Sequence, residues 1–157
     1  MKHPKHTEHP KHYWLVKSEA SCYSIDDLAR GKTTSWTGIR NFQARNYIRD
    51  GMHPGDSVLF YHSSGTPAEP SGVYGVAEVV SEAYTDTTAL DPRDEHYDLK
   101  SAWFAIDIRF VRKLSHPVTL AHIKDDPLLR KMLVAKPGQR LSVMPVEKGE
   151  FEGVVGE

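Results

Sequence analysis

Short apolar segments, separated by turn residues, recur along most of the chain. They are rich in β-branched and aromatic residues, and several alternate between apolar and polar positions, which is typical of half-buried strands. The segment 103–114, WFAIDIRFVRKL, alternates well, and SVLFYHS at 57–63 is the strongest strand signal. We therefore expect strands at 13–17, 33–36, 57–63, 73–84, 103–114 and 140–146.

Short helices are predicted between these strands. We expect them at 25–30, 41–50 and 119–124. Ser24 and Thr119 stand where an N-cap hydroxyl is favoured, and Gly31 and Gly51 stand just past the ends of the first two helices. The closing residues, EKGEFEGVVGE, predict only a weak helix.

The order of these segments predicts an α+β fold. A small mixed β-barrel of about five or six strands, with the short helices packed outside it, fits the pattern. An open α+β sheet is the alternative, because the number of strands does not distinguish the two. We expect residues 13–157 to form a single domain, since a chain of 157 residues is long enough to bury its own core.

Residues 1–12, MKHPKHTEHPKH, differ in composition from the rest of the chain. Histidine recurs at every third position, and a polyproline II strand would line these side chains along one side. A weak Ni, Cu or Zn site is one interpretation. We favour a disordered leader and expect no metal and no cofactor, because the segment lacks core-forming residues. The four histidines are His3, His6, His9 and His12.

The overall composition narrows the class of protein. Hydrophobic residues make up 39% and charged residues 26%, as in soluble globular domains. No apolar run reaches the roughly 20 residues of a membrane span, and no secretory signal is visible, so we expect no membrane partner. The single cysteine, Cys22, cannot form an internal disulfide, which fits a reducing cytosol and predicts a cytoplasmic location.

The net charge does not identify a partner. The chain has 20 basic and 21 acidic residues and a formal charge of −1, whereas nucleic-acid-binding domains are often strongly basic. Any nucleic-acid binding would depend on a local basic patch or on a pocket for one base. We therefore expect few phosphate contacts and a shallow salt dependence.

The stretch WTGIRNFQARN at 36–46 carries the most distinctive side chains. At about 100° per residue, Ala44 and Ile48 fall on the helical face that would meet the core. Arg40 and Asn41 fall on the same side in the first turn, beside the free N–H groups of the helix start, a place that suits an acceptor-rich ligand. An arginine paired with an acidic neighbour and a helix-capping asparagine are the alternative, and the residues alone favour neither.

Other candidate groups give weaker signals. Trp36 alone favours a core position, although Gly38 after it indicates a turn. His62 and Ser63 lie at the end of the strongest predicted strand. They either contact a ligand or form an exposed polar strand end. No G-x-S-x-G elbow is present, so the adjacent serine and histidine do not indicate a hydrolase. Cys22 has no nucleophile context, so we expect a buried or half-buried structural thiol.

The long polar segment 85–101 contains a group of potential metal ligands. They are Asp91, Asp94, Glu95, His96 and Asp98. Their spacing matches no EF-hand or zinc pattern, so solvated loop charges are the favoured interpretation.

Several segments in the right order together resemble the EVE-domain family, within the PUA-like superfamily of small β-barrels. They cover nearly everything from Tyr13 to Val146. The segments are YWLVKSE (13–19), YSIDDL (23–28), WTGIRNFQARN (36–46), GDSVLFYHS (55–63), YGVAEVV (74–80), YTDTTALDPRDEHYDLKS (84–101) and RLSVMPV (140–146).

The resemblance implies a non-catalytic reader of a modified base, such as methylated cytosine or adenine, in DNA or RNA. The family is similar to the YTH domain, which holds a methylated adenine in an aromatic cage, and Trp36 would be a cage wall. The implied ligand-binding residues are Ser18, Glu19, Trp36, Gly38, Arg40, Asn41, Tyr61, His62 and Ser63. Phosphate and backbone contacts are expected from local basic residues, and the candidates are Lys17, Arg40, Arg45, Arg49 and Lys100.

The chain departs from the family pattern at a few positions. Ala20 stands where proline is usual, Phe42 where tyrosine is usual and Met144 where glutamine is common. Two other functions are alternatives: an enzyme acting on RNA or a nucleoside, with His62 or Glu19 as acid or base, and a protein–protein adaptor. We expect a monomer.

Overall fold

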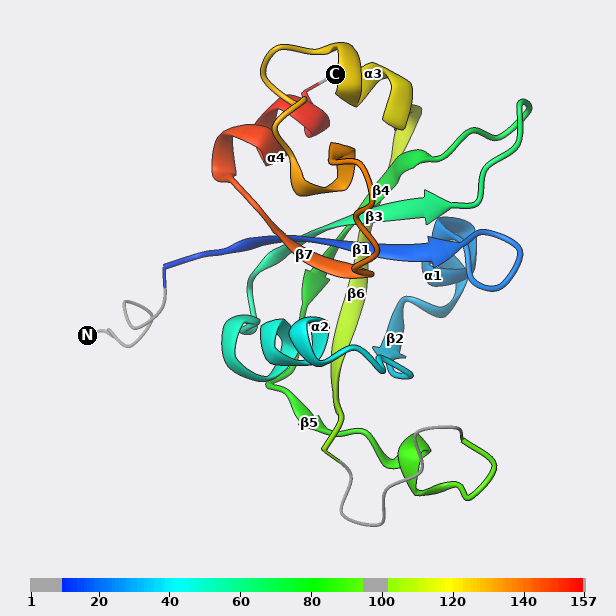
Figure 1. Cartoon of the computed structure of the whole chain (residues 1–157), viewed down its shortest axis with the longest axis vertical. Helices are drawn as coiled ribbons and strands as arrows, with labels where there is room; N and C mark the ends of the chain where they lie inside the picture. The colour runs from blue at the N-terminus through cyan, green and yellow to red at the C-terminus, as the bar shows by residue number, and fades with distance from the viewer. Residues whose placement is uncertain (1–9, 95–101, 157) are drawn as a thin grey trace.

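The computed structural model describes residues 10–94 and 102–156 (Figure 1). The predictions for residues 1–9, for Lys100, and for three of the loop's potential ligands lie outside this part of the chain. Those three are Glu95, His96 and Asp98. No helix of the described residues is long and apolar enough to cross a membrane.

The chain forms a seven-stranded mixed sheet. The strands are β1 (Tyr13–Glu19), β2 (Thr33–Trp36), β3 (Ser57–Ser63), β4 (Gly72–Val79), β5 (Tyr84–Thr85), β6 (Phe104–Thr119) and β7 (Val143–Val146). Their order is β2-β6-β4-β3-β1-β7, and β5 pairs with β6. Strands β1 and β3 are parallel, whereas every other described pair is antiparallel.

The mixed α+β class is confirmed, but the predicted barrel of five to six strands is not. The two end strands, β2 and β7, have four residues each and do not pair with each other among the described residues. A barrel requires every strand to have two neighbours. The sheet is therefore open, as in the alternative.

Helices lie where local capping signals predicted them. The α-helices are α1 (Ile25–Gly31), α2 (Phe42–Asn46), α3 (Leu120–Asp125) and α4 (Lys148–Val155); a π-helical turn, Tyr47–Gly51, continues α2, and 3₁₀ turns lie at Thr87–Leu90 and Leu133–Ala135. Ser24 caps α1 in a capping box with Asp27, and Thr119 caps α3. Helix α4 forms where the sequence predicted only a weak helix, and Glu147 and Glu150 form a capping box at its start.

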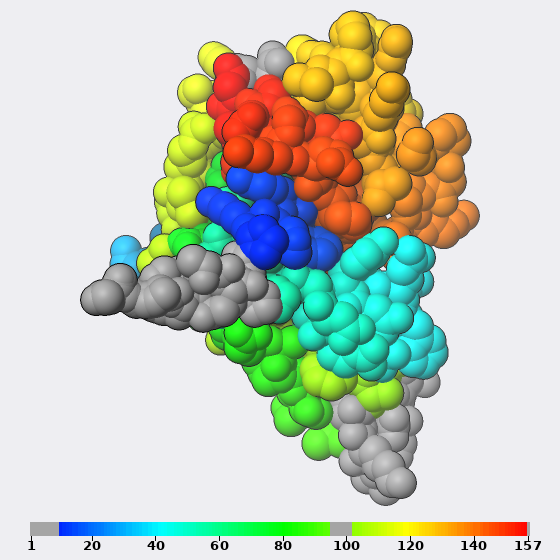
Figure 2. Space-filling model, turned by 90° about the vertical axis from the view of Figure 1, so that its left-hand side faces the viewer, coloured from blue at the N-terminus to red at the C-terminus, as the bar shows by residue number. Residues whose placement is uncertain are grey.

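Four predicted strands differ in extent from the observed ones. Strand β1 runs to Glu19, two residues further than predicted, and β7 begins at Val143 and not at residue 140. The segment 73–84 is not one strand but divides into β4 and β5, because the chain leaves the ladder after Val79. Strand β6 continues to Thr119 and bends where its register with β4 shifts. In Figures 1 and 2 the part of the chain around β5 and the following turn extends away from the body of the sheet.

Helix α1 packs closely on the sheet because β4 carries a glycine beneath it. A Cβ at Gly75 would lie 2.5 Å from the Cδ1 and Cγ1 atoms of Ile25. Ile25 and Leu28 are buried in the main core. The absent side chain at Gly75 thus sets how near α1 lies to the strands.

Candidate nucleic-acid interface

The junction between β2 and α2 has the orientation predicted from helical geometry. Ala44 and Ile48 are buried. Asn41 caps α2, since its Oδ1 accepts a hydrogen bond of 3.0 Å from the Ala44 N–H. Its side chain is thus engaged in the local structure, as the capping alternative required, while the residue itself remains exposed.

Arg40 points inward and is held by two carboxylates. Its Nη1 lies 3.1 Å from Asp86 Oδ2 and its Nη2 lies 2.9 Å from Asp94 Oδ2. Nη2 also donates to Thr88 Oγ1 at 2.8 Å. The hydrogen bond to Asp94 raises the pKa of Arg40, burial opposes this, and Asp86 adds to the increase. A phosphate would therefore meet a guanidinium whose charge is already balanced.

Asp86 organises this junction, and its side chain is fully buried. Besides Arg40 it accepts hydrogen bonds from the Gly38 N–H at 2.8 Å and from Thr88. Burial raises the pKa of Asp86, but the hydrogen bonds from Thr88, Gly38 and Arg40 outweigh it and leave the pKa lowered. Sequence reasoning missed this residue, because nothing local distinguishes Asp86 from the other acidic residues of its loop.

Trp36 is half-buried and joins a row of aromatic rings on β3. Its ring meets Phe60 edge-on, with centroids 5.6 Å apart and an interplanar angle of 78°. Phe60 in turn meets His62 edge-on at 5.8 Å. In the part of the chain that the structure describes, no ring is stacked parallel to Trp36.

The parallel pairing of β1 and β3 divides the other predicted residues between two faces. Lys17 is opposite Tyr61, Ser18 is opposite His62 and Glu19 is opposite Ser63. Because side chains alternate along a strand, Ser18 and His62 share a face with Phe60, whereas Lys17 and Tyr61 lie on the other.

The Lys17 ammonium lies 5.8 Å from the centroid of the Tyr61 ring. Burial lowers the pKa of Lys17. Burial raises the pKa of Tyr61, and a hydrogen bond with Ser71 partly offsets this. Lys17 and Tyr61 thus form a contact of their own on the face away from Trp36.

His62 is buried and supports α1. Its Nε2 accepts the Ile25 N–H at 3.1 Å, and its ring stacks on Tyr74 with centroids 4.2 Å apart and an angle of 19°. Desolvation by burial lowers the pKa of His62. The neutral ring must then carry its proton on Nδ1. Ser18 is also engaged, since its Oγ donates to the Tyr23 carbonyl at 2.5 Å.

Two hollows meet at the carboxyl ends of β1 and β3. One, of about 130 Å³, is lined by residues that include Glu19, His62 and Ser63. The other, of about 450 Å³, is lined by His62 and Tyr74 among others. Trp36, Arg40 and Asn41 line neither hollow, so the predicted ligand-binding residues do not form one site. Phe60 links the Trp36 ring to His62, whereas Tyr61 lies on the opposite face.

A second aromatic pair lies on the outer side of α2. Phe42 is 58% exposed and stacks on the buried Trp103, with centroids 4.6 Å apart and an angle of 27°. The Arg45 guanidinium lies 5.0 Å from the Phe42 centroid, and its Nη1 donates to the Ala102 carbonyl at 2.6 Å. Arg49, in contrast, is paired with Asp50 at 2.8 Å.

The other predicted groups do not form a site among the described residues. In the acidic loop Asp91 pairs with Arg93 and Asp94 with Arg40, so two of the predicted loop charges are ion-pair partners. Cys22 is exposed, and the expectation of a buried or half-buried thiol is wrong. It lies in the turn after β1, where its N–H donates to the Glu19 carbonyl.

Comparison with known proteins identifies the family. The model of the EVE domain matches residues 12–157. The chain belongs to the EVE domain family. Thymocyte nuclear protein 1 of Gallus gallus, an EVE relative, is 36% identical over 168 residues, which cover 91% of this chain and 67% of that protein.

Solved structures share the fold of this EVE domain. A hypothetical protein from Leishmania major is 43% identical, with a TM-score of 0.84 and 94% of each chain covered. The human THYN1 protein, solved in complex with DNA containing 5-methylcytosine, is 33% identical, with a TM-score of 0.81, and the match covers 93% of this chain and 96% of that one.

Proposed function

We propose that this EVE domain is a DNA-binding module that recognises a modified base, with 5-methylcytosine as the first candidate. The observation that carries the proposal is the similarity to the human protein that was solved with 5-methylcytosine DNA, over 93% of this chain. Methylated adenine and RNA are further candidates for the same site. A cytoplasmic location and a monomeric state belong to the proposal and rest on the sequence alone.

Trp36 is the proposed platform for the base. A base that is read individually must leave its stack, and an aromatic ring that replaces the stack contributes about 1–3 kcal/mol. The half-buried position of Trp36 and its edge-on contact with Phe60 support this role. His62 is a poorer platform, because its ring is already stacked on Tyr74.

Arg45 and Phe42 are the proposed contacts to the neighbouring nucleotide. Among the described residues Arg45 has no carboxylate within ion-pair distance, in contrast to Arg40 and Arg49. A cation beside an exposed aromatic ring suits a phosphate and its unstacked base. Arg40 has a different role, because with Asp86 it holds the Gly38 turn next to Trp36.

The proposal can be tested by binding to a panel of matched duplex and single-stranded oligonucleotides, each carrying cytosine, 5-methylcytosine, adenine or N6-methyladenine, in DNA and RNA. We expect the wild type to prefer one modified base. Trp36→Ala should abolish the preference, and Trp36→Phe should retain part of it. A methyl group adds only about 0.8 kcal/mol of apolar burial, so a preference near fourfold is the expected scale.

Matched variants separate the contacts. Phe42→Ala should weaken binding to all sequences about equally, whereas Leu128→Ala, at another exposed apolar residue, should leave binding unchanged. Melting temperatures measured for each variant would separate lost contacts from lost folding. Equal affinity for all oligonucleotides, together with unaltered binding by folded Trp36→Ala, would overturn the proposal.

One observation favours an enzyme as the second candidate. His62 is buried at the hollow beside the carboxyl ends of β1 and β3, and its pKa is lowered by desolvation, as in many catalytic sites. Its Nε2 is however occupied by the Ile25 N–H. Turnover of RNA or nucleosides that is lost in His62→Gln would support this alternative over a binding module. A protein–protein adaptor is the third candidate. It would be supported if the wild type bound all oligonucleotides of the panel with equal affinity.

A further inference from the structure

The amino end of the β1–β3 pair gathers metal-ligating groups from three positions. His12 precedes β1, and His53 and Asp56 lie in the turn before β3. One potential ligand atom of each lies within 4.8 Å of the other two. From this cluster we infer a binding site for a divalent transition metal of the zinc type, distinct from the proposed base site and independent of the proposed function.

The carboxylate of Asp56 is fixed in place by the protein. Its Oδ2 accepts hydrogen bonds from Trp14 Nε1 at 2.9 Å and from the His53 N–H at 3.0 Å. Its Oδ1 accepts one from the His12 N–H at 3.0 Å. Each carboxylate oxygen offers two lone-pair directions, so Oδ1 retains one for a metal ion.

The ring of His53 has the hydrogen-bond support that metal-binding histidines show. Its Nδ1 lies 2.9 Å from the Gly51 carbonyl, which can only accept, so Nδ1 carries the proton. The lone pair of the neutral ring is then on Nε2. A second ring nitrogen that donates to a backbone carbonyl is the usual support of a histidine ligand, because it sets both tautomer and direction.

His12 supplies the adjustable ligand. It is exposed, and its ring meets the Trp14 indole edge-on at 6.4 Å. Ligands of a tetrahedral zinc ion lie roughly 3.3 Å apart, given zinc–nitrogen distances of about 2.0–2.1 Å. Rotation of His12 about its side-chain bonds closes the remaining gap. Two imidazoles and one carboxylate suit Zn²⁺, and leave a fourth position for water or another ligand.

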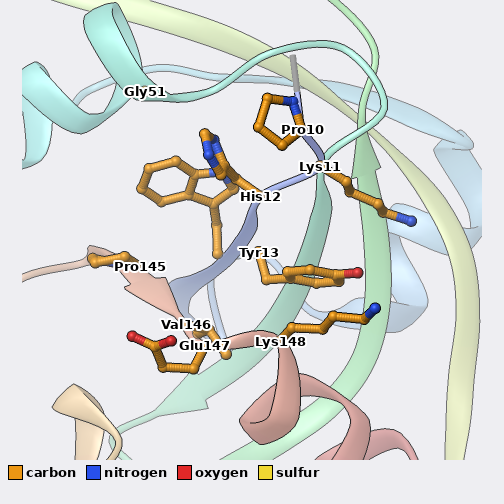
Figure 3. A pocket seen from close by; sticks show the side chains of 10 residues that line it. Pro10, Lys11, His12, Tyr13, Gly51, Pro145, Val146, Glu147 and Lys148 are labelled. Atoms are coloured by element: carbon orange, nitrogen blue, oxygen red, sulfur yellow. The ribbon is translucent and has the colours of Figure 1, made fainter. Parts of the chain in front are cut away.

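The site lies beside an open groove of about 630 Å³. Figure 3 shows Pro10 and His12 near the Gly51 turn, with Glu147 and Lys148 on the far side. A bound ion would tie the segment before β1 to the turn before β3. The expected consequence is a structural clamp on the amino end of the sheet.

Zinc titration of the full chain by calorimetry tests the site. A variant with His3, His6 and His9 replaced by Asn excludes zinc binding by these three preceding histidines. This variant should still bind one Zn²⁺ ion, with the affinity of the wild-type site. His53→Ala and His12→Ala should each weaken binding at least about tenfold. Zinc at about 100 times its dissociation constant should raise the melting temperature of the wild type by about 5–10 °C.

His122→Ala is the matched control, because His122 also lies near a carboxylate, with Nε2 3.6 Å from Asp126. It should bind zinc like the wild type. His12→Ala guards against a folding defect in His53→Ala, since His12 is exposed; metal-free melting curves check both. Absence of zinc binding, wild-type affinity in both single variants, or loss of all binding in the triple Asn variant would overturn the inference.

Discussion

At each end of the parallel β1–β3 pair a buried polar side chain accepts hydrogen bonds, and these two side chains, Asp56 and His62, are satisfied in different ways. At the amino end the carboxylate of Asp56 accepts three hydrogen bonds, from the main chain at His12 and His53 and from the Trp14 indole. At the carboxyl end the ring of His62 accepts one, from the Ile25 N–H. Both side chains tie a neighbouring segment to the sheet.

The difference lies in charge. A buried anion is tolerated only when several donors converge on it, and here the donors come from the β1 segment and from the turn before β3. A neutral imidazole needs a single donor, and stacking on Tyr74 covers its face. The amino end is thus held by an electrostatic centre that also suits a cation, while the carboxyl end is held by a neutral contact that leaves polar groups around an adjoining hollow.

The largest expected effect is at the amino end. Asp56→Ala leaves two backbone N–H groups and an indole N–H without their acceptor, and each such loss costs about 1–3 kcal/mol. We expect the free energy of unfolding to fall by at least about 3 kcal/mol in urea denaturation. Asp50→Ala, which breaks only the exposed pair with Arg49, should change it by less than about 1 kcal/mol. Similar losses in the two variants would contradict the assigned role of Asp56.

An intermediate effect is expected at the carboxyl end. His62→Leu leaves the Ile25 N–H unsatisfied, and we expect a loss of about 1–3 kcal/mol at pH 8 by urea denaturation. The pKa of His62 is lowered by burial, so below a pH of about 6.5 the unfolded chain binds the proton that the folded chain rejects. Wild-type stability should therefore fall with acid.

The leucine variant lacks this proton-linked loss, so its deficit relative to the wild type should narrow between pH 8 and pH 5. Urea denaturation of both proteins at the two values measures the change. A deficit that stays constant or widens in acid would show that His62 is not held in its neutral form by burial.

The smallest expected effect comes from the ring that covers His62. Tyr74→Leu removes an aromatic stack that contributes about 0.5–1.5 kcal/mol. It also removes the hydrogen bond from the Tyr74 hydroxyl to the Pro70 carbonyl. Tyr74→Phe retains the ring and loses only the hydroxyl, so it should lie between the wild type and Tyr74→Leu in urea denaturation. If both variants lose the same amount, stacking on His62 contributes nothing measurable.

Sequence patterns predicted the structural features that depend on residues close together along the chain. Ser24 and Thr119 mark helix starts by hydrogen bonds that span three residues. The 57–63 strand was predicted with its observed bounds, because its continuous apolar run ends in polar residues. The inward direction of Arg40 followed from helical geometry alone.

The features of the fold and of the candidate site that were not predicted depend on contacts between residues far apart in the sequence. Arg40 and Asp86 are 46 positions apart, and no local pattern pairs them. The open edges of the sheet depend on which strands meet, which strand propensity does not encode. Likewise the His12, His53 and Asp56 group is spread over 45 residues of sequence and is united only by the pairing of β1 with β3.

The close contact of Gly75 with Ile25 has a consequence for ligand size. Gly75 has no side chain that could yield, and the Ile25 N–H is bonded to His62, so α1 cannot tilt away from the sheet without breaking a buried hydrogen bond. That wall of the hollow is therefore rigid. A ligand wider than the hollow lined by Ile25 would have to displace the exposed loop between β3 and β4. The opening motion of this loop would then set the rates of ligand entry and release.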